Sequence, residues 1–441
     1  MESIVVEGGR PLEGRIAVSG AKNSVLPLLA AAILFQNGCL LHNCPRLSDV
    51  EASVEILEHL GCRVDRGGHS IWVDARGLCR EEIPKALMER MRSSILFLGP
   101  LLARTGRCTL YEPGGCCLGV RPIDLHLKGL EALGAQFTWD RDRLICRGKL
   151  RGAAVTLPFP SVGATENLIL AALGAEGTTT IYHAAREPEI GDLIGLLTAG
   201  GARIYGAGTS MLQIEGGFPD AAAYTVLPDR MEAATFLSAA AAAGGDICLD
   251  RMRPEDIRPV TQVFRAAGCR ITEGKTELRI ASAHPLQSVP PIRTAPYPGF
   301  PTDAQAPVMA ALLRAKGVTV FEETVFADRY RHVPALRALG GNIQVSGAIA
   351  ALTGVAELHG AQVEATDLRG GAAMVVAALS ARGRSRIGNV RHILRGYEDF
   401  AQRLASLGAE IRMENETAQS RYGGWYYGLG RTGRPAQEGA V

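Results

Sequence analysis

The sequence predicts a mixed α/β protein assembled from six copies of one structural unit, and three observations lead to this fold class. A motif in which glycine stands between the end of a helix and a strand-like run recurs six times, with successive glycines 73, 67, 67, 72 and 68 residues apart. Each copy contains an alanine-rich helical segment, and short β-branched runs separate the helices. A period of this length exceeds that of ordinary solenoid repeats, so each unit is expected to form a small subdomain.

The recurring glycines mark switches from helix to strand, because a helix often ends in a left-handed residue and glycine adopts that conformation readily. These residues are Gly61, Gly134, Gly201, Gly268, Gly340 and Gly408. We expect two helices and three or four strands in each unit. Two groups of three units would give two similar domains with a cleft between them.

The alanine-rich helix of each unit is apolar nearly all round, which is typical of a helix buried among other elements. We predict these helices at residues 24–35, 91–103, 163–174, 229–243, 302–316 and 366–382.

Cations stand at the beginnings of four of these helices, at Lys22, Arg92, Arg230 and Arg369. The helix dipole disfavours positive charge at an N-terminus, so these side chains require an anionic ligand or a carboxylate partner. Ser, Thr and Asp at the same ends are ordinary capping residues and need no functional explanation. If the units of each domain are pseudo-symmetric, the helix ends point to one electropositive region.

The bulk composition excludes several classes of protein. The 441 residues carry 47 basic and 45 acidic side chains, a balance that does not favour a nucleic-acid or membrane-surface protein. Apolar stretches are too short to span a bilayer, and the first residues do not resemble an export signal. The 10 cysteines show neither a Cys-x-x-Cys motif nor zinc spacing, so we expect reduced thiols and a cytoplasmic location.

The segment 112–126 is the most unusual part of the chain. Glycines on both sides of Cys116 predict a mobile loop with an accessible thiol that is able to donate a proton at neutral pH. Arg121 follows closely and could hold a phosphate or carboxylate. On these features alone, an incidental Cys116 fits as well as a catalytic one.

Eight short motifs, taken in order, resemble those of the UDP-N-acetylglucosamine 1-carboxyvinyltransferase family from residue 1 to about residue 415. They are Ser19-Gly20-Ala21-Lys22-Asn23-Ser24, Met91-Arg92-Ser93-Ser94, Pro113-Gly114-Gly115-Cys116 with Arg121-Pro122 and Asp124-Leu125-His126, Pro160-Ser161-Val162-Gly163, Pro228-Asp229-Arg230, Pro301-Thr302-Asp303, Thr366-Asp367-Leu368-Arg369 and Arg395-Gly396-Tyr397.

The resemblance implies a two-domain inside-out α/β barrel with three repeats in each domain. One domain would comprise residues 21–228 and carry the Cys116 loop, and the other would combine residues 1–20 with 229–418. Residues 419–441 have no counterpart and are expected to form a disordered tail.

The implied reaction adds the 3′-hydroxyl of UDP-N-acetylglucosamine to phosphoenolpyruvate and then eliminates phosphate. Cys116 would protonate the donor, Lys22, Arg121 and Arg395 would hold its phosphate and carboxylate, and Asp303 would accept the hydroxyl proton. The remaining substrate contacts implied are Asn23, Arg92, Pro122, Ile123, Asp124, Leu125, Ser161, Val162, Gly163, Asp229, Val325, Asp367 and Arg369. The resemblance implies neither a metal nor an organic cofactor, and nothing in the sequence indicates an obligate protein partner.

Two departures from the family pattern are Ala327, where an acidic residue is usual, and Cys117, where a small apolar residue is usual. Two alternatives stay open. One is the related transferase acting on shikimate 3-phosphate, although that group lacks the Gly-Gly-Cys loop. The other is a catalytically silent protein that binds a UDP-sugar.

Overall fold

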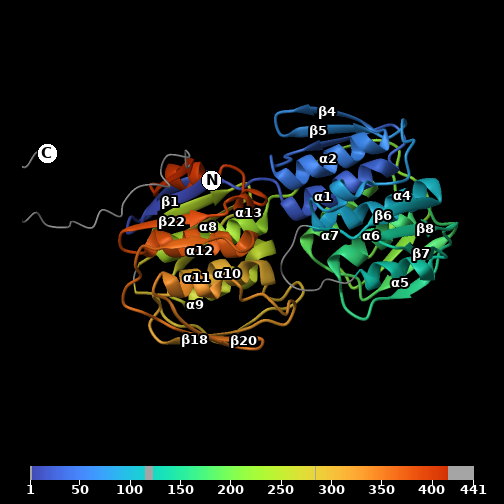
Figure 1. Ribbon diagram of the computed structural model, residues 1–441. Helices are drawn as coiled ribbons and strands as arrows, with labels where there is room; N and C mark the ends of the chain where they lie inside the picture. Colours follow the sequence, from blue (N-terminus) through green and yellow to red (C-terminus); the bar gives the residue numbers. More distant parts are fainter. Residues whose placement is uncertain (1, 115–122, 284, 416–441) are drawn as a thin grey trace, which may run out of the picture.

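The computed structural model describes residues 2–114, 123–283 and 285–415, and its buried apolar side chains form two separate cores. The first core extends from Val25 to Val226. The second combines residues 4–18 with residues 231–411. Figure 1 shows the two bodies side by side, with the N-terminal strand in the same body as the red C-terminal elements. The division into domains of residues 21–228 and of residues 1–20 plus 229–418 stays a prediction.

Three small sheets surround the first core within the described residues. Their strand orders are β13(Ala222–Thr225)-β3(Cys39–His42)-β5(Ser70–Asp74)-β4(Arg63–Gly67), β6(Arg107–Tyr111)-β8(Arg143–Arg147)-β7(Gln136–Asp140) and β11(Ile204–Tyr205)-β12(Met211–Glu215)-β10(Thr178–Tyr182)-β9(Ala154–Thr156). The helical segments are α1(Lys22–Ala31), η1(Ala32–Leu34), α2(Ser48–Leu60), α3(Lys85–Met88), η2(Arg92–Phe97), α4(Leu98–Thr105), α5(Asp124–Ala132), α6(Val162–Ala172) and α7(Pro188–Ala199).

The second core has the same plan, with three sheets that include the first two strands of the chain. Their strand orders are β15(Arg270–Glu273)-β16(Glu277–Ser282)-β14(Gly245–Asp250)-β2(Leu12–Ala17), β17(Ile292–Arg293)-β18(Val318–Glu322)-β20(Ile349–Thr353)-β19(Asn342–Ser346) and β21(Gln362–Glu364)-β22(Arg384–Gly388)-β1(Glu2–Glu7)-β23(Glu410–Asn415). The helical segments are α8(Arg230–Ala243), η3(Pro254–Ile257), α9(Arg258–Ala266), α10(Thr302–Ala311), α11(Val333–Ala338), α12(Leu368–Ser380), α13(Arg391–Leu394) and α14(Phe400–Ser406).

The repeated unit is visible in the strand pairing. Each four-stranded sheet combines one parallel pair with two antiparallel pairs, as in β9 with β10, β10 with β12 and β12 with β11. The six recurring glycines all have positive φ, between 93° and 100°. This confirms the predicted left-handed ends, where a side chain would be strained.

The alanine-rich helices lie inside and the sheets lie outside. Helices α8, α10 and α12 pack on one another, and α4 packs on α6, because small side chains allow close approach of helices. In Figure 1 the sheets β4–β5, β7–β8 and β18–β20 lie toward the outside of the two bodies. The architecture is the predicted two-domain α/β fold.

Three predicted helices differ in part from expectation. The α-helix predicted at 24–35 ends at Ala31 and continues as η1, and the one predicted at 302–316 ends at Ala311. The third differs at its start. Residues 91–103 begin as the 3₁₀ segment η2 and become α-helical only at Leu98. Pro100 lies in the first turn of α4, where a residue without an N–H is tolerated, and it could not continue the hydrogen-bond ladder of a helix that began at Arg92.

Within the described ranges, no helix is long and apolar enough to cross a membrane. All eight cysteines in these ranges are free thiols, and Cys79 alone among them is exposed.

Candidate active site

A cavity of about 890 Å³ lies between the two cores. Residues at or next to the N-terminal ends of α1, η2, α5, α6, α8, α10 and α12 line it, so the predicted convergence of helix ends is observed. The predicted site residues in its wall are Lys22, Asn23, Arg92, Asp124, Leu125, Ser161, Val162, Gly163, Asp303, Val325, Asp367, Arg369 and Arg395. The N-cap residues of α1 and α10, Ala21 and Pro301, provide no capping side chain, although the Asp229 carboxylate accepts from the first N–H of α1.

Asp49 joins two of the predicted cations across the cavity. Its Oδ2 accepts from the Lys22 ammonium at 2.9 Å, and the Arg395 guanidinium donates to both oxygens at 2.9 and 3.2 Å. Lys22 begins α1 in the first core, whereas Arg395 follows α13 in the second. Burial lowers the pKa of Lys22, although Asp49 opposes the shift. Burial would raise the pKa of Asp49, but Lys22 and Arg395 together hold it below its ordinary value.

Asp303 lies in the first turn of α10 between two guanidinium groups. Arg329 donates to Oδ1 at 2.9 Å and Arg369 donates to Oδ2 at 3.2 Å. Both arginine side chains are buried, while that of Asp303 is 29% exposed. Arg369 also donates to the Tyr397 hydroxyl at 2.9 Å. This arrangement fixes the carboxylate at the cavity wall, with its charge compensated and part of its surface accessible.

Two residues predicted to contact the substrate, Asp229 and Ile123, lie outside the cavity wall. Asp229 does not line the cavity: it caps α8 through Met231 and Glu232 and accepts from the Lys22 backbone N–H at 3.1 Å. Ile123 precedes α5 and packs against the first core, also outside the cavity wall. Asp229 therefore supports the first turns of α1 and α8, one from each core.

The catalytic and binding roles expected for Cys116, Arg121 and Pro122 fall on residues outside the described ranges, as do Cys117 and the tail 419–441. Ala327 lies in the short turn after Val325.

Sequence reasoning missed a group of acids in the cavity wall. Glu189 forms a bidentate ion pair with the buried Arg230, at 2.9 and 3.1 Å, and Glu187 accepts from the Tyr297 backbone N–H at 3.1 Å. Both contacts join the first core to the second. Burial, followed by Glu189 and Glu187, raises the pKa of Glu166 well above its ordinary value. These acids could have been suspected only as the carboxylate partners that Arg230 requires.

His126 is a second missed residue, although it belongs to one of the recognised motifs. Asn167 donates to its Nδ1 at 2.8 Å, which leaves the ring proton on Nε2, next to Gly163 at the start of α6. Burial, with Arg92 nearby, lowers its pKa to about 4. The ring is therefore neutral at physiological pH and its Nε2–H is available as a donor at the cavity wall.

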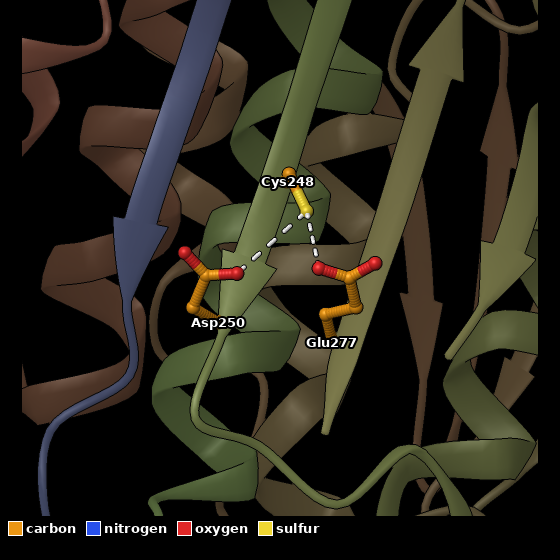
Figure 2. A group of neighbouring side chains, drawn as sticks. All are labelled: Cys248, Asp250 and Glu277. Atoms are coloured by element: carbon orange, nitrogen blue, oxygen red, sulfur yellow. Dashed lines mark hydrogen bonds between the residues drawn. The ribbon is translucent and has the colours of Figure 1, made fainter. Parts of the chain in front are cut away.

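One cluster with metal-ligand side chains lies apart from the cavity wall. Cys248, Asp250 and Glu277 lie on the neighbouring strands β14 and β16, as Figure 2 shows, with the sulfur 4.0 Å and 3.9 Å from the two carboxylates. The Arg15 guanidinium already contacts both acids. Its charge compensates theirs, so the cluster is explained as an ion-pair network on the sheet surface.

The sequence is similar to those of known enolpyruvyl transferases. The family model for EPSP synthase (3-phosphoshikimate 1-carboxyvinyltransferase) matches residues 6–404. UDP-N-acetylglucosamine 1-carboxyvinyltransferase 1 of Caldanaerobacter subterraneus subsp. tengcongensis is 46% identical over 411 residues, which are 92% of this chain and 98% of the relative. The enzyme of that name from Desulfatibacillum aliphaticivorans is 44% identical, over 93% of this chain and 99% of the relative.

Solved structures give the same fold. The enolpyruvyl transferase NikO from Streptomyces tendae superposes with a TM-score of 0.84 at 26% identity, covering 93% of this chain and 98% of that chain. EPSP synthase from Acinetobacter baumannii has a TM-score of 0.71 at 17% identity, covering 94% of this chain and 100% of that one, and shows the fold alone. On the strength of its closely matching relatives, the chain belongs to the enolpyruvyl transferases and, among them, to the UDP-N-acetylglucosamine 1-carboxyvinyltransferase family.

Proposed function

We propose that this chain transfers the enolpyruvyl group of phosphoenolpyruvate to the 3′-hydroxyl of UDP-N-acetylglucosamine and releases phosphate, the first committed step of peptidoglycan synthesis. The observation that carries the proposal is the meeting of Lys22 and Arg395, from opposite cores, in one cavity that also contains Asp303. The cavity volume lies within the ordinary range for small-molecule sites. A cytoplasmic location remains part of the proposal.

The donor is a small trianion, and the cationic centre suits it. Lys22 and Arg395 supply two fixed positive charges that would hold its phosphate and carboxylate, with Arg121 as the third. Preorganised charges of this kind stabilise the charge that develops during addition and elimination, and this is often the largest contribution to catalysis.

The acceptor would occupy the remainder of the cavity. Arg92, Ser161, Val162, Gly163 and Val325 lie in its wall and would contact the nucleotide sugar, together with Asp124 and Leu125. Asp303 would accept the proton of the 3′-hydroxyl as this oxygen attacks C2 of the donor. Cys116 would deliver a proton to C3, the role that the resemblance implies.

The test is phosphate release from phosphoenolpyruvate with each of two acceptors. We expect release with UDP-N-acetylglucosamine, together with an acceptor mass increased by one enolpyruvyl group, and no release with shikimate 3-phosphate. Release with shikimate 3-phosphate alone would contradict the proposal. Binding of the UDP-sugar without release in either reaction would favour the silent protein.

The role of Cys116 has its own test. Mass spectrometry after fosfomycin treatment, with UDP-N-acetylglucosamine present, should find one adduct on the peptide containing residue 116. Cys116→Ala should abolish turnover and Cys116→Asp should retain part of it, since only a proton donor is required. Cys117→Ala and Cys79→Ala are matched controls that remove an adjacent and an exposed thiol. An adduct on Cys117, or a fully active Cys116→Ala variant, would contradict the assignment.

A further inference from the structure

Asp49 is the carboxylate around which the two cations of the cavity are arranged. It lies in the first turn of α2, where the helix dipole favours a negative charge, and its side chain is only 5% exposed. Lys22 approaches it from the same core and Arg395 from the other. Its carboxylate therefore fixes the relative position of two groups that no covalent or secondary structure holds together.

Two cations share this one carboxylate in the wall of the cavity. It brings the Lys22 ammonium and the Arg395 guanidinium next to each other, although they come from different cores. Like charges placed this close repel each other, so the shared carboxylate is what keeps the pair together. An anionic ligand that binds at this place would be attracted by both cations at once.

We propose that Asp49 is a positioning residue of the donor site, which orients the Lys22 ammonium and recruits Arg395 from the opposite core to the place where the phosphoenolpyruvate anion binds. The inference rests on the proposed function and adds to it a residue that touches no reacting atom. Asp49 acts through the two cations, so its removal should affect the donor more strongly than the acceptor.

Asp49 also keeps Lys22 charged. The charged groups that face this ammonium are Asp49 from α2, Arg395 beyond α13 and Arg369 from α12, while Asp229 accepts from its backbone N–H. Burial and the two arginines lower the pKa of Lys22, and Asp49 is the group that raises it. Neutralising Asp49 should therefore lower the pKa of Lys22 further, and the alkaline decline of activity should begin at a lower pH.

The experiment compares Asp49→Asn with Asp74→Asn in the full chain. Asp74 is a matched control, because it also binds an arginine, Arg76, through both carboxylate oxygens but does not line the cavity. We expect Asp49→Asn to lower kcat/KM for phosphoenolpyruvate by about 100-fold, the cost of misplacing binding groups by about 1 Å. Its KM for UDP-N-acetylglucosamine should change by less than about threefold. The alkaline limb of its pH–activity profile should move to lower pH. Asp74→Asn should match the parent in both KM values and in the pH–activity profile.

A second variant, Asp49→Glu, keeps the charge and displaces it. We expect this variant to have a raised KM for phosphoenolpyruvate. The alkaline limb of its pH–activity profile should resemble that of the parent. If both Asp49 variants keep the parent KM for phosphoenolpyruvate, or if Asp49→Asn raises both KM values equally with no change in the pH profile, the inference is wrong. Failure of the parent itself to release phosphate would instead contradict the proposed function.

Discussion

The double contact of Asp229 allows a prediction in which two substitutions at one position have different effects. Oδ1 of this residue accepts from the N–H groups of Met231 and Glu232, and Oδ2 accepts from that of Lys22. Asp229→Ala removes all three bonds. Loss of an N-cap costs about 1 kcal/mol, and a buried N–H left without an acceptor costs about 1–3 kcal/mol. The expected loss of stability is therefore about 2–4 kcal/mol.

Asp229→Asn should have a smaller effect. The amide oxygen can still cap α8, but the amide N–H₂ would face the Lys22 N–H, donor against donor, at a cost of about 1–3 kcal/mol. For folding units of about 200 residues, each kcal/mol lowers the melting temperature by about 2–4 °C. Differential scanning calorimetry should give the order parent, Asp229→Asn, Asp229→Ala, with the last about 5–15 °C below the parent.

Asp367→Ala is the control, because Asp367 caps α12 through Arg369 and Gly370, within the second core. It should lose only the cap contribution of about 1 kcal/mol. Melting of Asp229→Ala within about 1 °C of the parent would refute the reasoning. Equal destabilisation by Asp229→Asn and Asp229→Ala would show that the contact with Lys22 contributes nothing.

Three further predictions concern other parts of the molecule. Asp303→Asn should lower kcat for phosphate release at least about 100-fold, because an amide cannot accept the hydroxyl proton. Calorimetry should still detect binding of UDP-N-acetylglucosamine to this variant. An undiminished kcat would contradict the role of Asp303 as the proton acceptor. Burial raises the pKa of Asp256 to about 6, so the stability that this group contributes is present below its unfolded pKa of about 3.9 and is lost as pH rises through 6. Asp256→Asn should therefore melt higher than the parent at pH 7.5 and equally near pH 4, and a constant difference would contradict this sign. Gly20→Ala should prevent folding, as judged by soluble yield and circular dichroism, because its Cβ would lie 1.7 Å from the Asn43 carbonyl oxygen. Gly191→Ala is the control: its Cβ meets nothing within 4 Å, and alanine in α7 should raise the stability by about 0.5–1 kcal/mol.

The fold could be predicted from the sequence largely because its repeats leave local signals. A helix that ends in a left-handed residue requires glycine at that position, so the positive φ of Gly61 and its five equivalents could be expected without coordinates. The helix beginnings were also visible as polar residues before alanine-rich runs. The 3₁₀ segment η2 was not foreseen, because its formation depends on the position of Pro100 relative to a helix start that the pattern alone does not locate.

The candidate site was predictable only in part. The sequence indicated that Lys22, Arg230 and Arg369 need anionic partners, and the structure supplies Asp49, Glu189 and Asp303. Which acid meets which cation could not be read from the chain, since Asp49 looks like any acidic residue in the first turn of a helix. Long-range pairing depends on how the units are placed, and sequence spacing carries no signal of that placement.

The pairing of β1 with β22 and β23 has a consequence for biosynthesis. The partners of this strand, Arg384–Gly388 and Glu410–Asn415, are translated almost a whole chain later. At about 5–20 residues per second, the N-terminal strand must remain unpaired for about 20–80 s after it leaves the ribosome. The body between residues 21 and 228 has all of its sheet partners much earlier and can close by itself. The second body therefore completes its sheets last, and a nascent chain that stalls late would leave both edges of β1 accessible to chaperones.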